Sequence, residues 1–337
     1  MFSFNVIGGV VARQIIQSSR PAIVGVVRDA YLTHHAGKSV NPNSYFLRFP
    51  DKPEARLIAL PAYLGGDREA VGIKWIGSFP KNIEHNVPRA SAVLLLNDYA
   101  TGYPFACLEA SQISAARTAA SAVLAAEQLV GGKTAPKVAV VGSGVIARNI
   151  VEFFHAQQWR IAQFAIFDQA RQYSESLACY ARTALDFAAA ASLSLSDTLD
   201  NADVVVLATT AAAPYICKPG SFAPGQVVLN VSLRDIDPDL IATSYNVLDD
   251  VDHCLTANTS PHLAEQKLGH RDFIDGTLAG LMLGELALGD DKPKIFSPFG
   301  LGVLDLAVGL HVYERATAEG HAQLIDGFFG ETQRWSA

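Results

Sequence analysis

The feature that most constrains the fold of this chain is a short run at residues 140–147, which is VVGSGVIA in one-letter code. It sets Gly142, Gly144 and Ala147 in the spacing Gly-x-Gly-x-x-Ala, between an apolar segment and a helical pattern. Small residues at a strand-to-helix turn let a phosphate reach the unpaired N–H groups and the positive dipole end of the helix. The run therefore predicts a Rossmann unit that binds a nicotinamide dinucleotide.

An acidic residue follows at the distance that such a unit requires. Asp168 ends the next predicted strand, 24 residues after Gly144 (168 − 144). A carboxylate there accepts hydrogen bonds from ribose hydroxyls and repels a 2′-phosphate, which favours NAD over NADP. Arg171 leaves NADP as an alternative cofactor, because an arginine near this carboxylate can bind a 2′-phosphate. We expect this unit to contact NAD through Gly142, Ser143, Gly144, Val145, Ile146 and Asp168, and through Thr209 and Ser232 at strand ends.

The surrounding pattern predicts an α/β fold with a doubly wound parallel Rossmann sheet. Fully apolar, β-branched strands are expected at residues 137–141, 162–167, 203–208, 226–231 and 295–297. Helical patterns at 144–157 and 170–182 separate the first three, and such alternation implies parallel strands joined by right-handed crossovers. The Ala/Ser-rich segment 187–195 is expected to be a loop or a helix end.

The part of the chain before residue 119 has a different texture and predicts an α+β domain. Short apolar segments between residues 45 and 109 are separated by turn residues, which is typical of a mostly antiparallel sheet. Residues 10–40 predict two helices, with Pro21 in the first turn of the second. Further helices are expected at 112–129 and, near the C-terminus, at 302–320.

Charge and cysteine usage exclude several classes of protein. The net charge is −7 and no Lys/Arg block is present, so we expect no nucleic-acid partner. The four scattered cysteines predict buried free thiols in a reducing compartment, and no residue spacing predicts a metal site. Since no signal-peptide pattern or long apolar run is visible, we expect a cytoplasmic chain without a membrane partner.

Several motifs together resemble the ornithine cyclodeaminase/mu-crystallin family. They are Gly72-Ile73-Lys74, Leu96-Asn97-Asp98, Thr101–Pro104, Ala116–Ala120, Val141–Gly144, and Phe299–Gly302 with Asp305. The resemblance covers about residues 40–315. It implies a homodimer in which residues 1–118 and 303–337 form the substrate-binding and dimerisation domain, while residues 119–302 form the NAD-binding Rossmann domain.

Within this family, four segments resemble one branch of NAD-dependent dehydrogenases. They are residues 74–82, 88–92, 103–109 and 232–235. This resemblance implies a small anionic substrate, N-(2-amino-2-carboxyethyl)-L-glutamate, which is oxidised at the glutamate Cα. Hydrolysis of the imine then gives 2-oxoglutarate and L-2,3-diaminopropionate, a building block of siderophores and peptide antibiotics. Other branches leave open a cyclodeaminase, a ketimine reductase or a non-catalytic ligand-binding protein.

A set of cations is the part of the site that the resemblance implies for the substrate. Arg48 and Lys74 lie in strand patterns, where a cation faces either water or a site. The resemblance assigns Arg48 and Arg117 to substrate carboxylates and Lys74 to the reacting amine, where a lowered pKa would let it accept the proton. Arg234 and Arg89 complete the set of cations for three carboxylates.

The region after residue 231 departs from the cyclodeaminases. The cyclodeaminases carry an aspartate in this region that acts on the ornithine amine. When the two sequences are aligned by their motifs, Arg234 stands at that position, which disfavours cyclisation. A shift of one position would instead make the residue Asp235.

Polar residues outside the Rossmann motif complete the expected cofactor set. Thr118 and Ser91 either contact the cofactor or serve as cap and turn residues. Asp305 either contacts the nicotinamide or complements the helix dipole. His85, in a predicted loop, is held only as an acid/base candidate.

Overall fold

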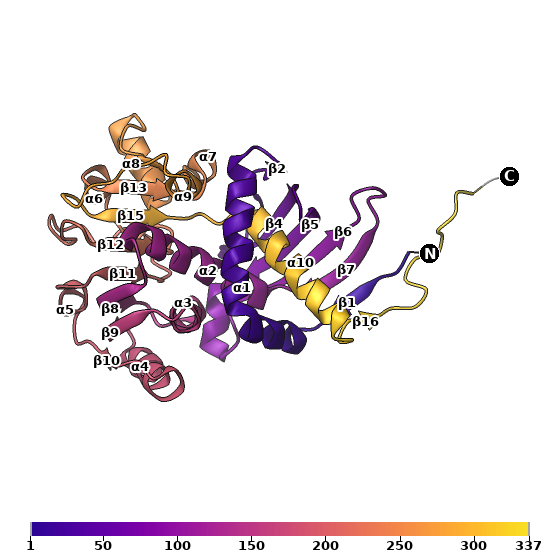
Figure 1. Cartoon of the computed structure of the whole chain (residues 1–337), viewed down its shortest axis with the longest axis horizontal. Helices are drawn as coiled ribbons and strands as arrows, with labels where there is room; N and C mark the ends of the chain where they lie inside the picture. The colour runs from indigo at the N-terminus through magenta and orange to yellow at the C-terminus, as the bar shows by residue number, and fades with distance from the viewer. Residues whose placement is uncertain (1, 336–337) are drawn as a thin grey trace. The chain divides into compact units, whose positions relative to one another are not determined.

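The computed structural model describes residues 2–335 and divides into two compact units. Unit 1 comprises Met1–Arg117 and Leu301–Ala337, and unit 2 comprises Thr118–Gly300 (Figure 1). These limits lie one and two residues from the domain boundaries expected from the sequence. Among residues 2–335, no helix combines the length and the apolar character needed to cross a membrane.

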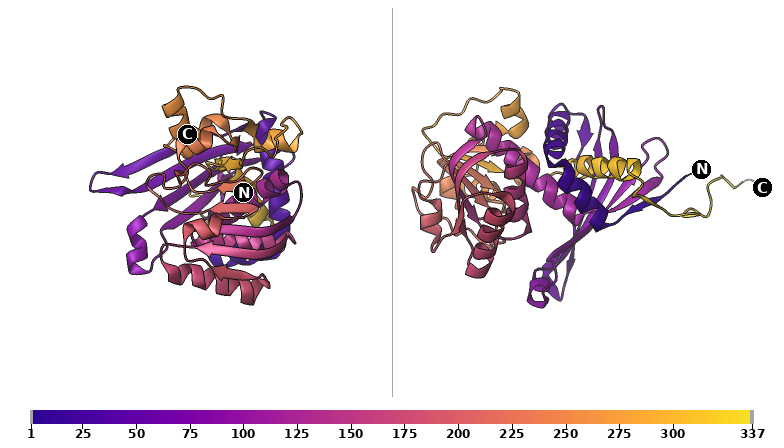
Figure 2. Two further views of the ribbon diagram at one scale, coloured as in Figure 1. Left: turned by 90° about the vertical axis from the view of Figure 1, so that its left-hand side faces the viewer. Right: turned by 60° about the horizontal axis from the view of Figure 1, so that its bottom comes forward.

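Unit 2 is built on a parallel sheet in the order β10-β9-β8-β11-β12-β15-β13-β14. Its pairings are all parallel, and helices pack around it (Figure 2). Its strands are β8 (Thr134–Val141), β9 (Arg160–Phe167), β10 (Ala189–Ala191), β11 (Val204–Leu207), β12 (Val227–Asn230), β13 (Tyr245–Leu248), β14 (Gly276–Thr277) and β15 (Lys294–Ser297). Strand order reverses at the β8–β11 pair, where doubly wound sheets bind ligands beyond the carboxyl ends of the strands. The predicted fold class is confirmed.

The helices of unit 2 follow its strands. They are α3 (Val145–Ala156), α4 (Arg171–Leu185), α5 (Leu195–Leu199), α6 (Pro238–Ala242), α7 (Val251–Cys254), α8 (Ser260–Leu268) and α9 (Leu278–Met282). Helix α2 (Ser111–Val130) runs through the boundary between the units. The loop expected at 187–195 is wrong in part: Ala189–Ala191 forms β10 in parallel register with β9. Alanine favours strands weakly, so pairing with an existing strand decides the outcome here.

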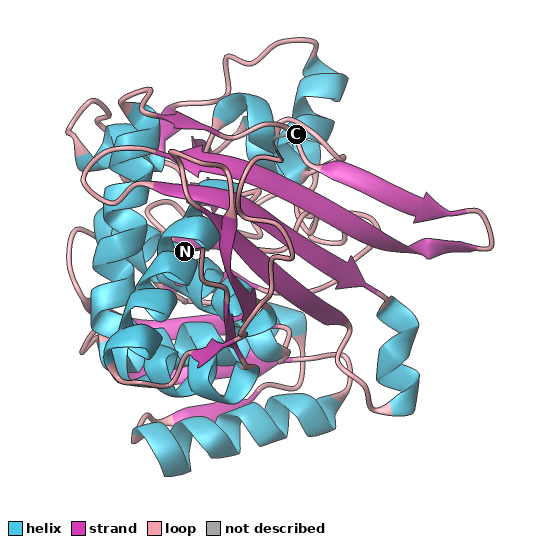
Figure 3. Cartoon of the chain, turned by 90° about the vertical axis from the view of Figure 1, so that its right-hand side faces the viewer, coloured by secondary structure: helices cyan, strands magenta, loops and turns pink. Residues whose placement is uncertain are grey.

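Unit 1 contains a twisted sheet in the order β16-β1-β7-β6-β5-β4-β2, with β3 paired to β4 (Figure 3). It is antiparallel, as predicted, except that β1 runs parallel to β7. The strands are β1 (Asn5–Ile7), β2 (Ser39–Val40), β3 (Tyr45–Phe49), β4 (Lys52–Leu64), β5 (Ala70–Ser78), β6 (Ala90–Asn97), β7 (Pro104–Glu109) and β16 (Gln323–Leu324). A 3-10 helix, Pro80–His85, connects β5 to β6.

Two long helices, α1 (Gly9–His35) and α10 (Gly302–Ala318), belong to this unit. The two helices predicted for residues 10–40 form the single element α1, which kinks at Ser19, two residues before Pro21. Helix α10 packs on β4, β5 and β6 at positions where glycine removes a clash. A Cβ at Gly309 would lie 2.0 Å from the Leu94 side chain, and one at Gly72 would lie 3.1 Å from Leu306.

The two faces of the unit 1 sheet differ because successive strand residues point to opposite sides. On the α10 side, Lys74 stands in a row between Leu60 and Leu94 of the neighbouring strands. On the other side, Trp75 pairs with Val93, and their side chains are 40% and 41% exposed. This second face is therefore apolar and in part open to solvent.

Candidate functional site

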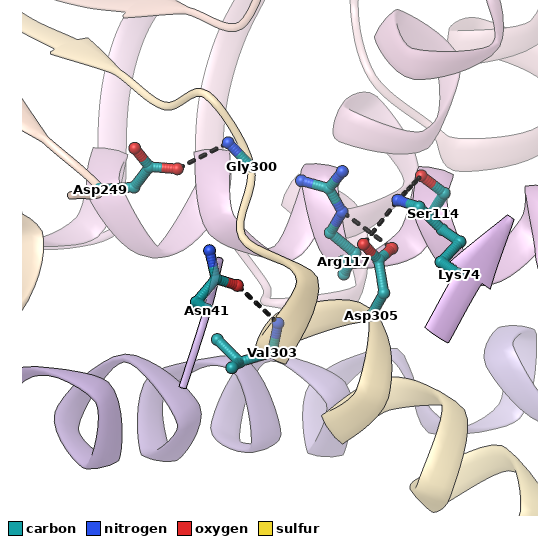
Figure 4. A network of polar contacts seen from close by, with 8 residues as sticks. All are labelled: Asn41, Lys74, Ser114, Arg117, Asp249, Gly300, Val303 and Asp305. Atoms are coloured by element: carbon teal, nitrogen blue, oxygen red, sulfur yellow. Dashed lines mark hydrogen bonds and ion pairs between the residues drawn. The ribbon is translucent and has the colours of Figure 1, made fainter. Parts of the chain in front are cut away.

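A buried cluster of two cations and one carboxylate lies between β5, α2 and α10 of unit 1 (Figure 4). Asp305 Oδ2 accepts a hydrogen bond from Lys74 Nζ at 2.5 Å, and Asp305 Oδ1 accepts one from Arg117 Nε at 3.1 Å. Lys74 Nζ also donates to Ser114 Oγ at 3.3 Å. Lys74 and Arg117 were both predicted site residues, and the structure brings them together through Asp305.

Burial controls the charge of Lys74. Its side chain is 2% exposed, and the loss of water around the ammonium lowers the pKa of Lys74 from 10.5 to about 8. The positive charge of Arg117 lowers this pKa further, whereas the Asp305 carboxylate raises it. This direction agrees with the lowered pKa expected for Lys74, and an amine with a pKa of about 8 can accept a proton near that pH.

Arg117 keeps part of its guanidinium available. Its ion pair with Asp305 uses Nε, and the side chain is 12% exposed, whereas Asp305 is fully buried. The two Nη groups point away from the Asp305 carboxylate (Figure 4). Such a planar pair of N–H donors can bind a carboxylate through two parallel hydrogen bonds.

The glycine turn of unit 2 has the geometry of a phosphate-binding loop. Gly142 adopts φ +90°, and a Cβ there would lie 2.5 Å from the carbonyl oxygen of Ala208. Gly144 precedes α3 in an extended conformation, and a Cβ there would meet nothing within 4 Å. Gly142 is thus required by the fold itself, whereas Gly144 leaves open space in front of the N-terminus of α3.

Two polar groups of this turn fit a bound dinucleotide. Asp168 Oδ2 accepts a hydrogen bond from the N–H of Ser143 at 2.8 Å, and Oδ1 accepts one from the N–H of Ala170 at 2.9 Å. The buried Oγ of Ser143 has no hydrogen-bond partner among residues 2–335. Val145, in the first turn of α3, leaves its side chain 52% exposed. An anion at this helix N-terminus would supply the missing partner of Ser143 and cover Val145.

Arg171 is engaged elsewhere. Its Nε donates to Glu175 at 2.7 Å within α4. Both side chains are exposed, and a surface pair of this kind contributes little to stability.

The predicted strand-end residues take part in internal contacts of unit 2. Asp235 is fully buried and accepts hydrogen bonds from Thr209 Oγ1 at 2.8 Å and from Tyr215 Oη at 2.9 Å. Ser232 Oγ donates to the carbonyl of Leu207 at 3.1 Å. The sequence did not single out Tyr215, since nothing local connects it to residue 235.

Arg234 is half-buried beside this network. Its Nη2 donates to the carbonyl of Ala257 at 3.0 Å, and its buried Nε has no partner among residues 2–335. The guanidinium therefore retains a donor for a ligand. Asp235, the alternative occupant of the cyclodeaminase position, has its carboxylate covered by hydroxyl groups.

A second buried carboxylate, absent from our predicted site, fixes the end of unit 2. Asp249, after β13, accepts hydrogen bonds from the N–H of Phe299 at 3.1 Å and of Gly300 at 2.7 Å (Figure 4). Burial raises the pKa of Asp249, while these backbone donors oppose the rise. The motif residues Phe299 and Gly300 are thus held by a carboxylate that lies 50 and 51 residues earlier in the chain.

The remaining predicted residues stay apart from these contacts. Arg48 is exposed on β3 and its guanidinium lies 5.4 Å from the centre of the Phe46 ring. Arg89 Nε donates to Ser78 Oγ at 3.3 Å, and partial burial lowers the pKa of Arg89. The other three residues lie on different elements: Ser91 is exposed on β6, Thr118 is half-buried in α2, and His85 ends the 3-10 helix rather than lying in a loop.

The cysteines are free thiols, but the expectation that they are buried is wrong for three of them. Cys254 is buried, Cys107 is half-buried, and Cys179 and Cys217 are exposed. Among residues 2–335, no group of three or more His, Cys, Asp or Glu side chains is arranged to hold a metal ion.

Comparison with known proteins places these features in a family. The profile of the ornithine cyclodeaminase/mu-crystallin family matches residues 11–320. The chain is 29% identical over 309 residues to N-((2S)-2-amino-2-carboxyethyl)-L-glutamate dehydrogenase of Staphylococcus aureus, covering 87% of this chain and 89% of that protein.

Solved structures share the fold over nearly the whole chain. The Delta(1)-pyrroline-2-carboxylate reductase of Thermococcus litoralis, in complex with NADH and L-proline, superimposes with a TM-score of 0.87 at 21% identity, covering 96% of this chain and 100% of that chain. An archaeal alanine dehydrogenase dimer with bound NAD gives a TM-score of 0.86 at 22% identity, covering 97% and 100%. The predicted nicotinamide dinucleotide agrees with the cofactors of these two proteins.

Proposed function

Since this chain belongs to the ornithine cyclodeaminase/mu-crystallin family, we propose that it is an NAD-dependent dehydrogenase of N-(2-amino-2-carboxyethyl)-L-glutamate. The substrate is oxidised at the glutamate Cα, and the products are 2-oxoglutarate and L-2,3-diaminopropionate. The likeness to the staphylococcal dehydrogenase supports this choice of substrate.

The observation that carries the proposal is the buried Lys74–Asp305–Arg117 cluster. With Lys74 protonated, the cluster holds two positive charges against one negative charge. When Lys74 is neutral, the guanidinium of Arg117 remains to bind an anionic substrate. A charged carboxylate must be paired when it leaves water, and the Nη edge of Arg117, which points away from Asp305 (Figure 4), can provide that pairing. A substrate with several carboxylates fits such a cluster better than a diamine, which a cation would repel.

Lys74 is the residue that we propose to move the proton. Oxidation of a secondary amine removes a hydride from Cα and the proton from nitrogen, and the nitrogen lone pair forms the C=N bond. With a pKa of about 8, Lys74 is partly neutral near pH 8 and can accept that proton. The protonated Lys74 can then return this proton to the imine nitrogen, which activates the carbon for attack by water. The neutral amine so restored accepts a proton from the attacking water and passes it to the leaving nitrogen, which releases the two products.

The glycine turn of unit 2 is the proposed site of NAD. Gly144 and the N–H groups at the start of α3 would receive the pyrophosphate, and Asp168 would lie beside the adenosine ribose. Bound NAD would supply the acceptor for the hydride. Because Asp168 already orders the turn through the Ser143 N–H, the loop needs little rearrangement on binding.

A direct assay tests this proposal. Purified protein, NAD and N-(2-amino-2-carboxyethyl)-L-glutamate should produce NADH and 2-oxoglutarate in equal amounts. Release of ammonia from ornithine without net NADH would instead identify a cyclodeaminase, and NAD(P)H-dependent reduction of a cyclic imine would identify a reductase. Binding of NAD without turnover of any of these compounds would leave a ligand-binding protein.

One observation disfavours the cyclodeaminase. At the position where those enzymes carry a reactive aspartate, either Arg234 or Asp235 stands in this chain. Arg234 would repel the ornithine side-chain ammonium. Asp235 already accepts hydrogen bonds from Thr209 and Tyr215, so its carboxylate has no free face for that amine.

We also propose that the chain forms a homodimer through the open face of the unit 1 sheet. Trp75 and Val93 expose apolar side chains on this face, beside half-buried Ile73 and Leu95. A contiguous apolar sheet face is typical of an interface. The archaeal alanine dehydrogenase of similar fold is a dimer, which supports a second copy as the occupant.

A further inference from the structure

Asp305 divides its two oxygens between two different cations. Oδ2 lies 2.5 Å from Lys74 Nζ and Oδ1 lies 3.1 Å from Arg117 Nε, and the carboxylate itself is fully buried. A fully buried carboxylate is stable only when hydrogen-bonded cations compensate for the loss of its hydration. Neither cation can move away without leaving part of that charge unpaired.

The first turn of α10, which carries Asp305, is held against the sheet from outside the helix. Asn41 Oδ1 accepts a hydrogen bond from the N–H of Val303 at 3.2 Å (Figure 4). This bond satisfies one of the unpaired donors at the start of the helix. A Cβ at Gly302 would lie 3.2 Å from the Cβ of Ala62, so glycine lets the turn approach β4 closely. These contacts hold the backbone that carries Asp305 in place, and they involve no charged side chain.

Among the described residues, the charged groups that act on Lys74 come from two helices. They are Asp305 from α10 and Arg117 from α2, with Ser114 of α2 as a neutral partner and with Leu60 and Leu94 of the adjacent strands as apolar neighbours. The balance between one anion and one cation at short range therefore governs whether Lys74 keeps its proton.

We infer that Asp305 is a positioning residue, which ties Lys74 and Arg117 to the first turn of α10 and favours the protonated form of Lys74. It touches neither substrate nor cofactor in this assignment, which replaces the contact with the nicotinamide considered from the sequence. The effect of Asp305 on catalysis rests on the proposed amine oxidation. The effect of Asp305 on the protonation of Lys74 is independent of the reaction that the protein catalyses.

The coupling is measured without substrate, by NMR titration of protein labelled with 13C-lysine. The Lys74 signal is identified by its absence in Lys74→Arg. Its midpoint should lie near pH 8 in the parent protein. In Asp305→Asn, which keeps the side-chain volume, the midpoint should fall by about one to three pH units, because the neighbouring opposite charge is gone.

Two further variants test whether the sign of the neighbouring charge sets the direction in which the Lys74 midpoint moves. Arg117→Gln removes a like charge and should raise the Lys74 midpoint. Glu314→Gln removes one negative charge from the exposed surface of the same helix, where Glu314 pairs with Arg68, and should leave the midpoint unchanged. If Asp305→Asn does not fold, Arg117→Gln carries the test, and an unchanged or lower midpoint in that variant overturns the inference.

Kinetics then separate this inference from the proposed function. The pH at which kcat/KM reaches half its plateau should fall in Asp305→Asn with the NMR midpoint, whereas a purely structural role would lower the plateau and leave that pH unchanged. A folded Asp305→Asn variant with an unmoved or raised Lys74 midpoint overturns the inference. Midpoints that shift as expected in a protein that oxidises no secondary amine would refute the proposed function and retain the coupling.

Discussion

The two glycines of the turn at 142–144 should fail in opposite ways when each is changed to alanine. Gly142 adopts φ +90°, and its new Cβ would lie 2.5 Å from the carbonyl oxygen of Ala208. The left-handed conformation costs a non-glycine residue about 1–2 kcal/mol. Moving the end of β11 to relieve the contact adds about 1–3 kcal/mol, as in other overpacked sites.

The expected loss of stability for Gly142→Ala is therefore about 2–5 kcal/mol. For a unit of this size each kcal/mol lowers the melting temperature by about 2–4 °C, so a decrease of about 4–20 °C is expected. Calorimetric melting of the protein without NAD measures it directly. Weaker NAD binding should accompany the loss, since the turn itself is displaced.

Gly144→Ala provides the matched control. Its φ of −76° suits alanine, and the new Cβ meets no protein atom within 4 Å. Alanine is a poorer N-cap than glycine by about 0.5–1 kcal/mol, and the stiffer unfolded chain offsets about 0.4–1 kcal/mol, so the melting temperature should change by less than about 2 °C. The Cβ does enter the space proposed for the pyrophosphate, and NAD affinity should fall at least about tenfold, or 1.4 kcal/mol.

Titration calorimetry with NAD measures both affinities. Undiminished NAD binding by a folded Gly144→Ala protein would refute the assignment of this turn to the cofactor. A loss of stability in Gly144→Ala as large as that in Gly142→Ala would refute the distinction between a glycine needed for folding and one needed for the ligand.

Four further outcomes follow from the cluster and the open sheet face. Lys74→Met should lower kcat for amine oxidation by about 10²–10⁴-fold and leave NAD affinity within about twofold, since general-base catalysis alone is lost. In the parent protein kcat/KM should rise with pH and reach half its plateau near pH 8, because Lys74 must be neutral to accept the proton; a flat profile from pH 6 to 10 would contradict this role. Arg117→Ala should abolish substrate use while NAD titrations stay nearly unchanged, and equal loss of both would mean that the guanidinium does not serve the substrate. Val93→Glu on the open face should shift sedimentation from dimer to monomer, whereas a Val93→Thr control should not.

Local patterns were sufficient for the Rossmann unit. The strand at 137–141, the glycines that follow it and Asp168 are defined by residues within about 30 positions of one another, and backbone geometry at such a turn depends on which residues lack a side chain. The sequence also identified Lys74 and Arg117 through motifs, and it anticipated the direction of the Lys74 pKa.

Contacts between distant segments were not visible in the same way. Asp305 was ambiguous between a helix-dipole residue and a cofactor contact, because its partners lie 231 and 188 residues earlier in the chain. Thr209 and Ser232 were correctly placed at strand ends, but their hydroxyl groups bind Asp235 and the carbonyl of Leu207. In each case the polar atom that the sequence predicted to contact a ligand makes a hydrogen bond within its own unit.

What the sequence alone determined was which segments form strands, helices and the phosphate-binding turn, since hydrophobic period and glycine placement act over a few residues. What only the tertiary structure decided was the electrostatic partnership of Lys74, because the packing of α10 onto β5 brings the Asp305 carboxylate to an amine far away in the chain. Charges affect one another through distance in space and through the exclusion of water, and neither quantity is written in the order of residues.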